Sequence, residues 1–292
     1  MPRTPAGLVL AEQQPPSRRR RLLLRVIGAG LVLAVVIAGF IGVRTIIDSL
    51  NPPACWTLAP SQRVEITPEQ AGNAATIAAV AVQRGLPTRA ATIAIATAMQ
   101  ESKLRNLRYG DRDSVGLFQQ RPSQGWGTIE QILNPVYASN AFYDKLVKVK
   151  SYLTRPLTEV AQEVQRSGAP TAYAQHEDEA QALAAALTGS APATLVCRLA
   201  QPTTRPVSVA VETALKAEFG IESVVSGRTV TATAEGARAW AIASWAVARG
   251  EALGVIIVDA DGRSWTRVDP ESWPTAIPPA KGSVVITLAA TP

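Results

Sequence analysis

The chain has very little histidine, and this limits the chemistry it can perform. His176 is the only histidine among 292 residues. A serine hydrolase triad would have to use it, and a zinc site built from several histidines is excluded. The sequence also lacks a glycine-rich phosphate loop and a dinucleotide-binding fingerprint. We therefore expect no metal and no organic cofactor.

Cysteine is almost as scarce, with Cys55 and Cys197 as the only two residues of this type. A cysteine peptidase using His176 is disfavoured, because both cysteines lie at the edges of a predicted domain and pair more simply with each other. In an exported protein the oxidising surroundings favour one disulfide between them. In the chain-entropy model such a long closure stabilises the fold by roughly 4 to 5 kcal/mol. Two buried free thiols are the alternative.

The positive charge is concentrated at the N-terminus. Residues 1–25 hold six Arg and one Glu, which leaves 23 basic and 22 acidic residues in the rest of the chain. The net charge of +6 therefore predicts no nucleic-acid partner. Residues 26–43 are eighteen uncharged residues, about the length needed to cross a bilayer, although a cleavable signal peptide is the alternative. The positive-inside rule then predicts a single-pass protein of the cell membrane, with a cytoplasmic N-terminus and an extracytoplasmic catalytic domain.

Local sequence signals for helix starts, turns and domain boundaries predict the organisation of the chain. Thr67-Pro68-Glu69-Gln70 is a capping box that opens a helix, and Asp261-Gly262 is typical of a two-residue hairpin turn. Beyond Thr203 to Pro206 the helical pattern gives way to short strands and a Trp-containing helix. The role of this C-terminal domain is unknown, and it is a candidate site for a protein partner. The predicted parts are a basic cytoplasmic tail (1–25), a transmembrane helix (26–43), a linker (44–66), a helical domain (67–200) and a small α+β domain (206–292).

After these exclusions, the carboxyl groups of Asp and Glu are the remaining candidates for catalysis. Glu101 ends an apolar helix predicted from Thr88, and a polar, glycine-rich loop follows at 106–128. An acid that protonates a glycosidic oxygen must stay protonated near neutral pH. Apolar burial and the negative end of a helix both raise the pKa of a carboxyl group. Glu101 is thus the candidate catalytic acid, and a solvated surface charge is the alternative.

The order of motifs around Glu101 resembles a known superfamily. Glu101-Ser102, then Gly116-Leu117-Phe118-Gln119, then an aromatic stretch at Trp126 are similar to the catalytic core of the lysozyme-like superfamily, particularly its soluble lytic transglycosylase and goose-type lysozyme branch. The resemblance covers residues from about 67 to 190. It implies a mainly α lysozyme-like domain, here preceded by one transmembrane helix and followed by a small α+β domain. It also implies cleavage of the bond between N-acetylmuramic acid and N-acetylglucosamine in peptidoglycan glycan strands.

The resemblance also implies roles for particular side chains. Glu101 would act as acid and then as base, while Ser114, Gln119 and Trp126 would position the glycan, the last by stacking on a sugar face. Tyr173 would support Glu101 and the substrate, or else it is simply a core residue. Ala174 stands where the family has Asn, which leaves one substrate hydrogen bond in doubt and supports a rival reading, a peptidoglycan-binding or wall-assembly scaffold without turnover.

A second carboxylate is less clearly marked. Retaining glycosidases place a nucleophilic carboxylate about 5 Å from the acid, and inverting enzymes place a base roughly 6.5 to 9.5 Å away. Asp113 and Asp111 are the candidates, but each is also typical of a residue that stabilises a turn. Lytic transglycosylases need one Glu alone, because the N-acetyl group and the 6-hydroxyl of the substrate complete the reaction. We therefore favour a transglycosylase over a muramidase that uses water.

Overall fold

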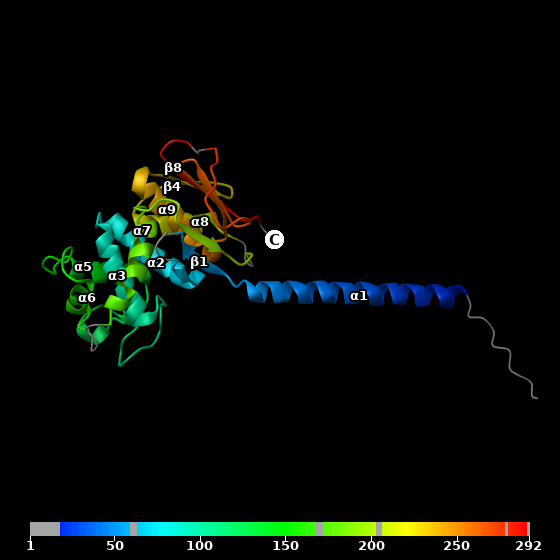
Figure 1. Cartoon of the computed structure of the whole chain (residues 1–292), viewed down its shortest axis with the longest axis horizontal. Coiled ribbons are helices and arrows are strands. Elements are labelled where there is room, and N and C mark those ends of the chain that lie inside the picture. Colours follow the sequence, from blue (N-terminus) through cyan, green and yellow to red (C-terminus); the bar gives the residue numbers. More distant parts are fainter. Residues whose placement is uncertain (1–17, 59–62, 167–171, 203–205, 278–279, 291–292) are drawn as a thin grey trace, which may run out of the picture. The chain divides into compact units, whose positions relative to one another are not determined.

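The computed structural model describes residues 18–58, 63–166, 172–202, 206–277 and 280–290. The chain divides into two compact units, Met1–Pro52 and Pro53–Pro292. The described part of the first unit consists mainly of one long helix, α1 (Arg18–Leu50) (Figure 1).

The membrane-spanning role predicted for this region is wrong. Within the described ranges, no helix is both long enough and apolar enough to cross a bilayer. The uncharged stretch of α1 has only eighteen residues, four of which are Gly, and it lies between Arg25 and Arg44. Such a stretch is at the lower end of the roughly 17 to 25 residues that a span needs. The transmembrane helix at 26–43 and the single-pass membrane localisation derived from it are both corrected by this finding.

The second unit is a mixed α/β structure with two antiparallel sheets, so the predicted mainly α class is also wrong. One sheet has the strand order β2-β1-β3, and the other, whose strands lie between Ser223 and Leu288, has the order β4-β5-β8-β6-β7. The first sheet was missed because β1 (Ala54–Thr57) and β2 (Glu65–Ile66) lie in the predicted linker, while β3 (Leu195–Arg198) follows the helical region. Strands of two to four residues are too short to show the alternating pattern that identifies a strand.

Between β2 and β3 the chain is helical, and its helix starts follow the local sequence. Thr67 and Gln70 form the predicted capping box, in which each side chain accepts a hydrogen bond from the backbone N–H of the other. Asn134 caps a later helix by accepting from the two N–H groups that follow Pro135. The α-helices of this region are α2 (Pro68–Gln83), α3 (Thr88–Ser102), α4 (Ile129–Ile132), α5 (Pro135–Leu146), α6 (Leu157–Gln165) and α7 (Glu177–Leu187).

The five-stranded sheet and its helices make up the C-terminal part of the unit. The hairpin between β6 and β7 turns at Asp261 and Gly262, whose φ angles of 45° and 74° are both positive, as a type I′ turn requires. The predicted hairpin is therefore confirmed. The elements are α8 (Ser208–Phe219), β4 (Ser223–Ser226), β5 (Thr229–Thr233), α9 (Gly236–Ala248), α10 (Gly250–Leu253), β6 (Val255–Ala260), β7 (Arg263–Thr266) and β8 (Ser283–Leu288).

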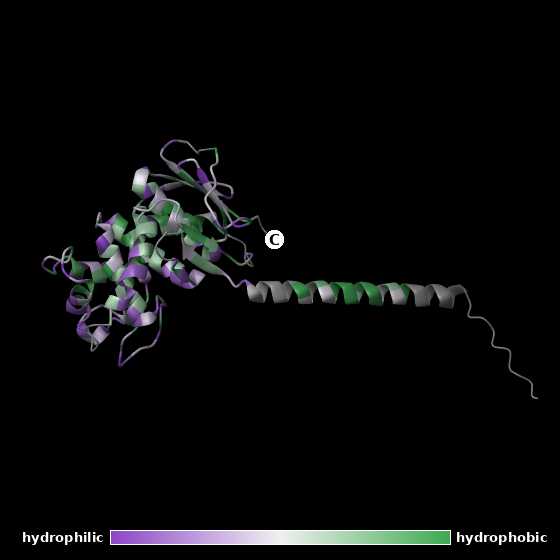
Figure 2. Ribbon diagram, viewed as in Figure 1, coloured by the Kyte–Doolittle hydropathy of each residue, from purple (hydrophilic) through white to green (hydrophobic). Residues whose placement is uncertain are grey.

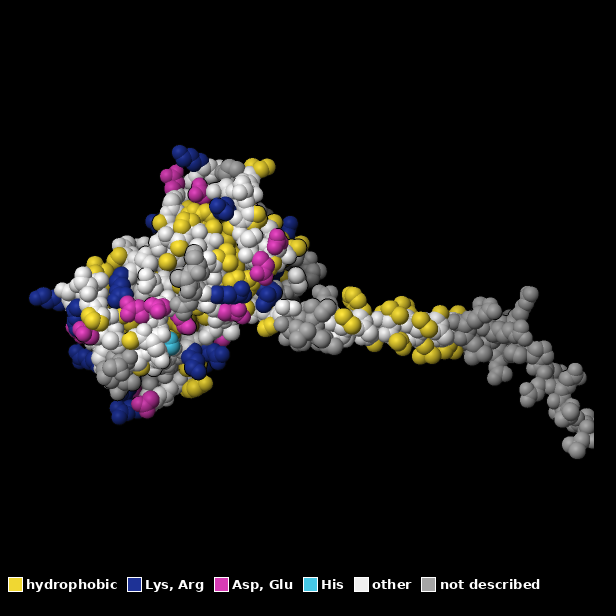
Figure 3. Space-filling view, viewed as in Figure 1, with side chains coloured by type: hydrophobic (Ala, Val, Ile, Leu, Met, Phe, Trp, Pro, Cys, Tyr) yellow, Lys and Arg dark blue, Asp and Glu magenta, His cyan; other side chains and the backbone are white. Residues whose placement is uncertain are grey.

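Helix α9 connects the two sheets within one core. It packs against α2, α7 and β3, and also against β6 and β8. Its ribbon is among the hydrophobic parts of the unit (Figure 2), and it is buried from Ala239 to Ala248. Charged side chains of both signs are scattered over the visible face of the unit (Figure 3). The division predicted near residue 206 stays a prediction, although the buried residues on either side of it belong to one cluster.

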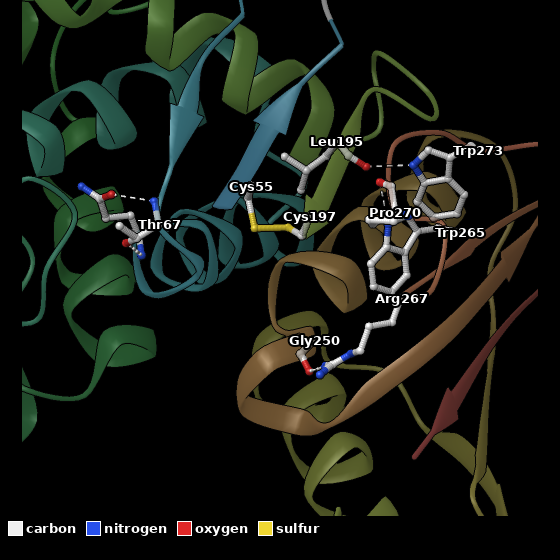
Figure 4. Close-up of a disulfide and its surroundings, with 10 residues drawn as sticks. Cys55, Thr67, Leu195, Cys197, Gly250, Trp265, Arg267, Pro270 and Trp273 are labelled. Carbon is white, nitrogen blue, oxygen red and sulfur yellow. Dashed lines mark hydrogen bonds between the residues drawn. A yellow bond between two sulfur atoms is a disulfide. The ribbon is translucent and has the colours of Figure 1, made fainter. Parts of the chain in front are cut away.

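The predicted disulfide is confirmed. Cys55 and Cys197 are directly opposite each other on β1 and β3 and are bonded (Figure 4). Close to it, the indole Nε1 of Trp273 donates to the carbonyl of Leu195 over 2.8 Å. The buried guanidinium of Arg267 donates to the carbonyls of Ala200 and Gly250. Strand β3 is thus joined covalently to β1, and β3 and Ala200 are joined by hydrogen bonds to the segment between β7 and β8.

Candidate active site

Glu101 is the penultimate residue of α3, and its position follows from the composition of that helix. Residues 90–99 consist of Ala, Ile, Thr and Met, and all of them are buried. The helix therefore passes through the core and emerges at its C-terminal end, where Glu101 is half-buried. A carboxyl group reaches the surface here with apolar packing behind it.

Ser102 connects the Glu101-Ser102 segment to the Gly-Leu-Phe-Gln segment at residues 116–119. Its hydroxyl is within hydrogen-bond distance of the carbonyls of Leu117, at 2.7 Å, and Ala98, at 3.0 Å. The loop at this point depends on Gly116, which has φ +82° and whose hypothetical Cβ would lie 2.8 Å from the carbonyl oxygen of Ile132. An L side chain is disfavoured there by both the backbone conformation and the lack of space. The Glu-Ser and Gly-Leu-Phe-Gln segments are therefore parts of one site.

Two side chains contact the carboxyl group of Glu101. The hydroxyl of Tyr173 donates to Glu101 Oε1 over 2.6 Å, and Tyr173 is fully buried. The amide of Gln165 also forms a hydrogen bond with this carboxyl group. Burial raises the pKa of Glu101, and the hydrogen bonds from Tyr173 and Gln165 lower it by a smaller amount. The outcome is a carboxylic acid with an elevated pKa, which is what proton donation near neutral pH requires.

Gln165 is the residue of this site that the sequence analysis missed. It is the last residue of α6, and its Nε2 also donates to the carbonyl of Phe118 over 2.6 Å. One amide thus contacts both Glu101 and the Gly-Leu-Phe-Gln segment. The sequence around Gln165 resembles any polar helix end, so no local signal distinguishes it. Its role depends on the packing of α6 beside α3.

Ser114 and Gln119, predicted to bind glycan, mainly contact their own loop. Ser114 is buried, and its hydroxyl donates to the carbonyl of Asp111. The Nε2 of Gln119 lies 3.2 Å from the carbonyl of Gly116 and 3.4 Å from that of Tyr109. These bonds shape the loop next to Glu101. Direct contact with a sugar stays a prediction for both residues.

Trp126, predicted to stack on a sugar, lies mostly inside the protein. Its side chain is 5% exposed, and the Nζ of Lys145 lies 3.1 Å from the centroid of its ring system. A sugar stacking on that face of the ring would have to displace the ammonium group. Trp126 nevertheless lines a pocket, together with Lys145 and Gln165.

Asp113, the candidate second carboxylate, is held by its own loop. Its Oδ1 accepts from Arg121 Nε at 2.8 Å and from the hydroxyl of Ser123 at 3.0 Å, while its Oδ2 accepts from the backbone N–H of Ser123 at 2.8 Å. The hydrogen bond from Arg121, followed by those from Ser123, lowers the pKa of Asp113 well below its usual range. Both oxygens therefore have structural partners, and the group is ionised.

His176 lies near Glu101, beside the residue that directly precedes Glu101 in the sequence. It is half-buried, and its Nε2 is 3.2 Å from Oε1 of Gln100, the residue before Glu101. Gln175 donates to the same oxygen at 3.0 Å. Burial lowers the pKa of His176. Gln175, which follows Ala174, is thus bound to Gln100 at the edge of the site.

The described residues contain no group of three or more His, Cys, Asp or Glu side chains that could hold a metal ion. No family model matches the chain, and no curated protein matches it either.

Proposed function

We propose that this protein cleaves the glycosidic bond between N-acetylmuramic acid and N-acetylglucosamine in peptidoglycan, with Glu101 as the catalytic acid. The observation that carries the proposal is the environment of this carboxyl group. It is half-buried at the end of an apolar helix, its pKa is raised by that burial, and it accepts a hydrogen bond from a fully buried tyrosine. This tyrosine is also the residue that the resemblance to the lysozyme-like superfamily assigns to support the acid.

In the proposed reaction, Glu101 transfers its proton to the glycosidic oxygen, and the bond between that oxygen and C1 of the muramic acid breaks. The resulting carboxylate is stabilised by the hydroxyl of Tyr173 and the amide of Gln165. The 6-hydroxyl of the muramic acid then attacks C1 and returns its proton to Glu101. The product is a 1,6-anhydro sugar, and the reaction neither consumes nor releases water.

The hydrogen bonds that Asp113 accepts from Arg121 and Ser123 support an anhydro product over a hydrolysis product. A water nucleophile would require a second carboxylate that is free to act as base. Both oxygens of Asp113 are occupied by Arg121 and Ser123. We therefore infer that the substrate supplies its own nucleophile.

The test uses the full chain and purified peptidoglycan. We expect the parent protein to release soluble anhydro-muropeptides, which mass spectrometry identifies as lighter than hydrolysis products by one water. Glu101→Gln keeps the shape of the side chain but lacks the transferable proton, so its rate should fall by about 10² to 10⁴.

A matched control is Glu130→Gln, which changes an exposed glutamate in the first turn of α4 and should leave the rate unchanged. Full activity in Glu101→Gln would refute the proposed role of Glu101. Peptidoglycan binding without any release of products by the parent protein would instead identify a non-catalytic scaffold.

A further inference from the structure

A pocket of about 620 Å³ lies beside the candidate active site. Its walls come from the segment around Trp126, the end of α5 with the residues that follow it, and the end of α6. The side chains that matter for its chemistry are Trp126, Lys145, Lys148, Glu163, Gln165 and Arg166.

The pocket carries an excess of positive charge. Lys145, Lys148 and Arg166 contribute three cations, against the single carboxylate of Glu163. That carboxylate is already paired, because Arg155 donates to it over 2.8 Å. The three cations take part in none of the ion pairs found among the described residues. The pocket therefore presents positive charge that no carboxylate in the described part of the chain balances.

The arrangement of Lys145 shows how closely these charges are gathered. Its ammonium group lies over the ring of Trp126, 3.1 Å from the centroid, and the side chain is half-buried. Burial lowers the pKa of Lys145, and the charges of Arg166 and Lys148 lower it further. Like charges held together in this way repel one another, and an anion bound between them would remove that repulsion.

Gln165 connects the pocket to Glu101. Its side chain lines the pocket, donates to the carbonyl of Phe118 and forms a hydrogen bond with the Glu101 carboxyl group. Its Oε1 is buried and has no hydrogen-bond partner in the structure. A buried amide oxygen without a partner costs free energy. A ligand in the pocket is thus separated from the catalytic carboxyl group by one side chain.

We propose that this pocket binds a carboxylate of the peptide carried by N-acetylmuramic acid. This inference rests on the proposed function. In a peptide-bearing strand the N-acetylglucosamine is neutral, and the lactyl carboxyl group of the N-acetylmuramic acid is in the amide bond to the peptide. The anions of such a strand are therefore the carboxylates of the peptide. These carboxylates match the three cations of the pocket. The volume is also in the range of about 300 to 1,000 Å³ that is usual for small-ligand pockets.

Binding is measured by calorimetry on full-chain Glu101→Gln, which prevents turnover. The probes are the disaccharide of N-acetylglucosamine and N-acetylmuramic acid with a dipeptide attached, the same compound with its carboxylates converted to amides, and inorganic phosphate. We expect the carboxylate form to bind about tenfold more tightly than the amide form, since a lost charge-assisted hydrogen bond typically exceeds 1.4 kcal/mol. Added salt should weaken this binding.

Variants identify the residues responsible. Adding Lys148→Gln or Arg166→Gln should each weaken binding of the carboxylate form by about threefold, and the double variant should no longer distinguish it from the amide. Lys150→Gln is the matched control, because Lys150 is exposed two positions from Lys148 and does not line the pocket. It should leave the affinity unchanged.

Other results would overturn the inference. Equal affinity for the carboxylate and amide forms, or unchanged affinity in the double variant, would refute a carboxylate site. Phosphate binding that depends on Lys148 and Arg166, without preference for the peptide-bearing probe, would assign the pocket to a phosphate ligand instead. The proposed function fails separately, if the parent protein releases no products from peptidoglycan while the probe still binds through the two cations.

Discussion

Tyr173 and Glu101 lie 72 positions apart in the sequence, and a hydrogen bond of 2.6 Å joins the tyrosine hydroxyl to Glu101 Oε1. The bond stabilises the ionised carboxylate and lowers its pKa, whereas burial acts in the opposite direction and is the larger effect. The pKa of Glu101 is therefore set by two opposing effects, burial and hydrogen bonding.

Tyr173→Phe removes the hydroxyl and should raise the pKa of Glu101 further. The alkaline limb of the pH–rate profile should shift to higher pH, and the free energy of unfolding should fall by about 1 to 3 kcal/mol. Tyr143→Phe is the control, because the hydroxyl of Tyr143 is equally buried and donates to the carbonyl of Ile77 over 3.0 Å, away from Glu101. It should lower the stability without moving the profile. Identical profiles for the two variants would show that Tyr173 has a purely structural role.

Glu101→Gln should make the protein more stable at neutral pH while abolishing activity. The pKa of Glu101 is raised in the folded state, so folding favours the protonated form. Its contribution to stability is fully present below the unfolded pKa and is lost as the pH rises through the folded pKa. Gln does not titrate, so the variant should melt at a higher temperature than the parent at pH 7, and the difference should shrink as the pH falls towards 4. A variant that is less stable at pH 7 would contradict the raised pKa.

Asp113→Asn should affect stability and leave the product unchanged. The folded pKa of Asp113 is lowered, so its stabilisation is present above the unfolded pKa and is lost as the pH falls through the folded value. The variant should therefore unfold at a lower urea concentration at pH 7, and Asp111→Asn, which changes an exposed side chain, should not. Anhydro products should persist in both variants. Reducing-end products in the parent that disappear with Asp113→Asn would establish a hydrolase with two carboxylates.

Replacing both Cys55 and Cys197 by Ser should destabilise the protein by roughly 5 kcal/mol in the chain-entropy model, because the bond closes a loop of 142 positions. Chemical unfolding with and without a reductant measures the effect. The reductant should have no effect on the double variant. Equal stability of the parent with and without the disulfide would show that pairing of β1 with β3 alone holds the two ends together.

The parts of the structure that could be predicted from the sequence depend on neighbouring residues. The capping box at Thr67 and the turn at Asp261 and Gly262 each involve residues at most three positions apart, so their signals are local. Glu101 and Tyr173 were identified from motif resemblance, and the structure places them in contact.

The parts that were missed depend on long-range pairing. Strand β1 has four residues, and its partner β3 is more than a hundred positions away, so neither segment is recognisable alone. The contact of Gln165 with Glu101 arises only when α6 packs beside α3. The membrane-spanning helix was wrong for a different reason, since an apolar stretch of marginal length was interpreted from its length and flanking charges.

The disulfide also determines how the protein would carry mechanical tension. A force pulling on the two ends of residues 53–292 passes from β1 to β3 through the covalent bond between Cys55 and Cys197. The 142 positions that it bridges, which would extend by roughly 500 Å if unravelled, bear none of this load. Glu101, Tyr173 and Gln165 all lie within the bridged segment. The candidate site would therefore stay relaxed while the chain outside the bridged segment is stretched.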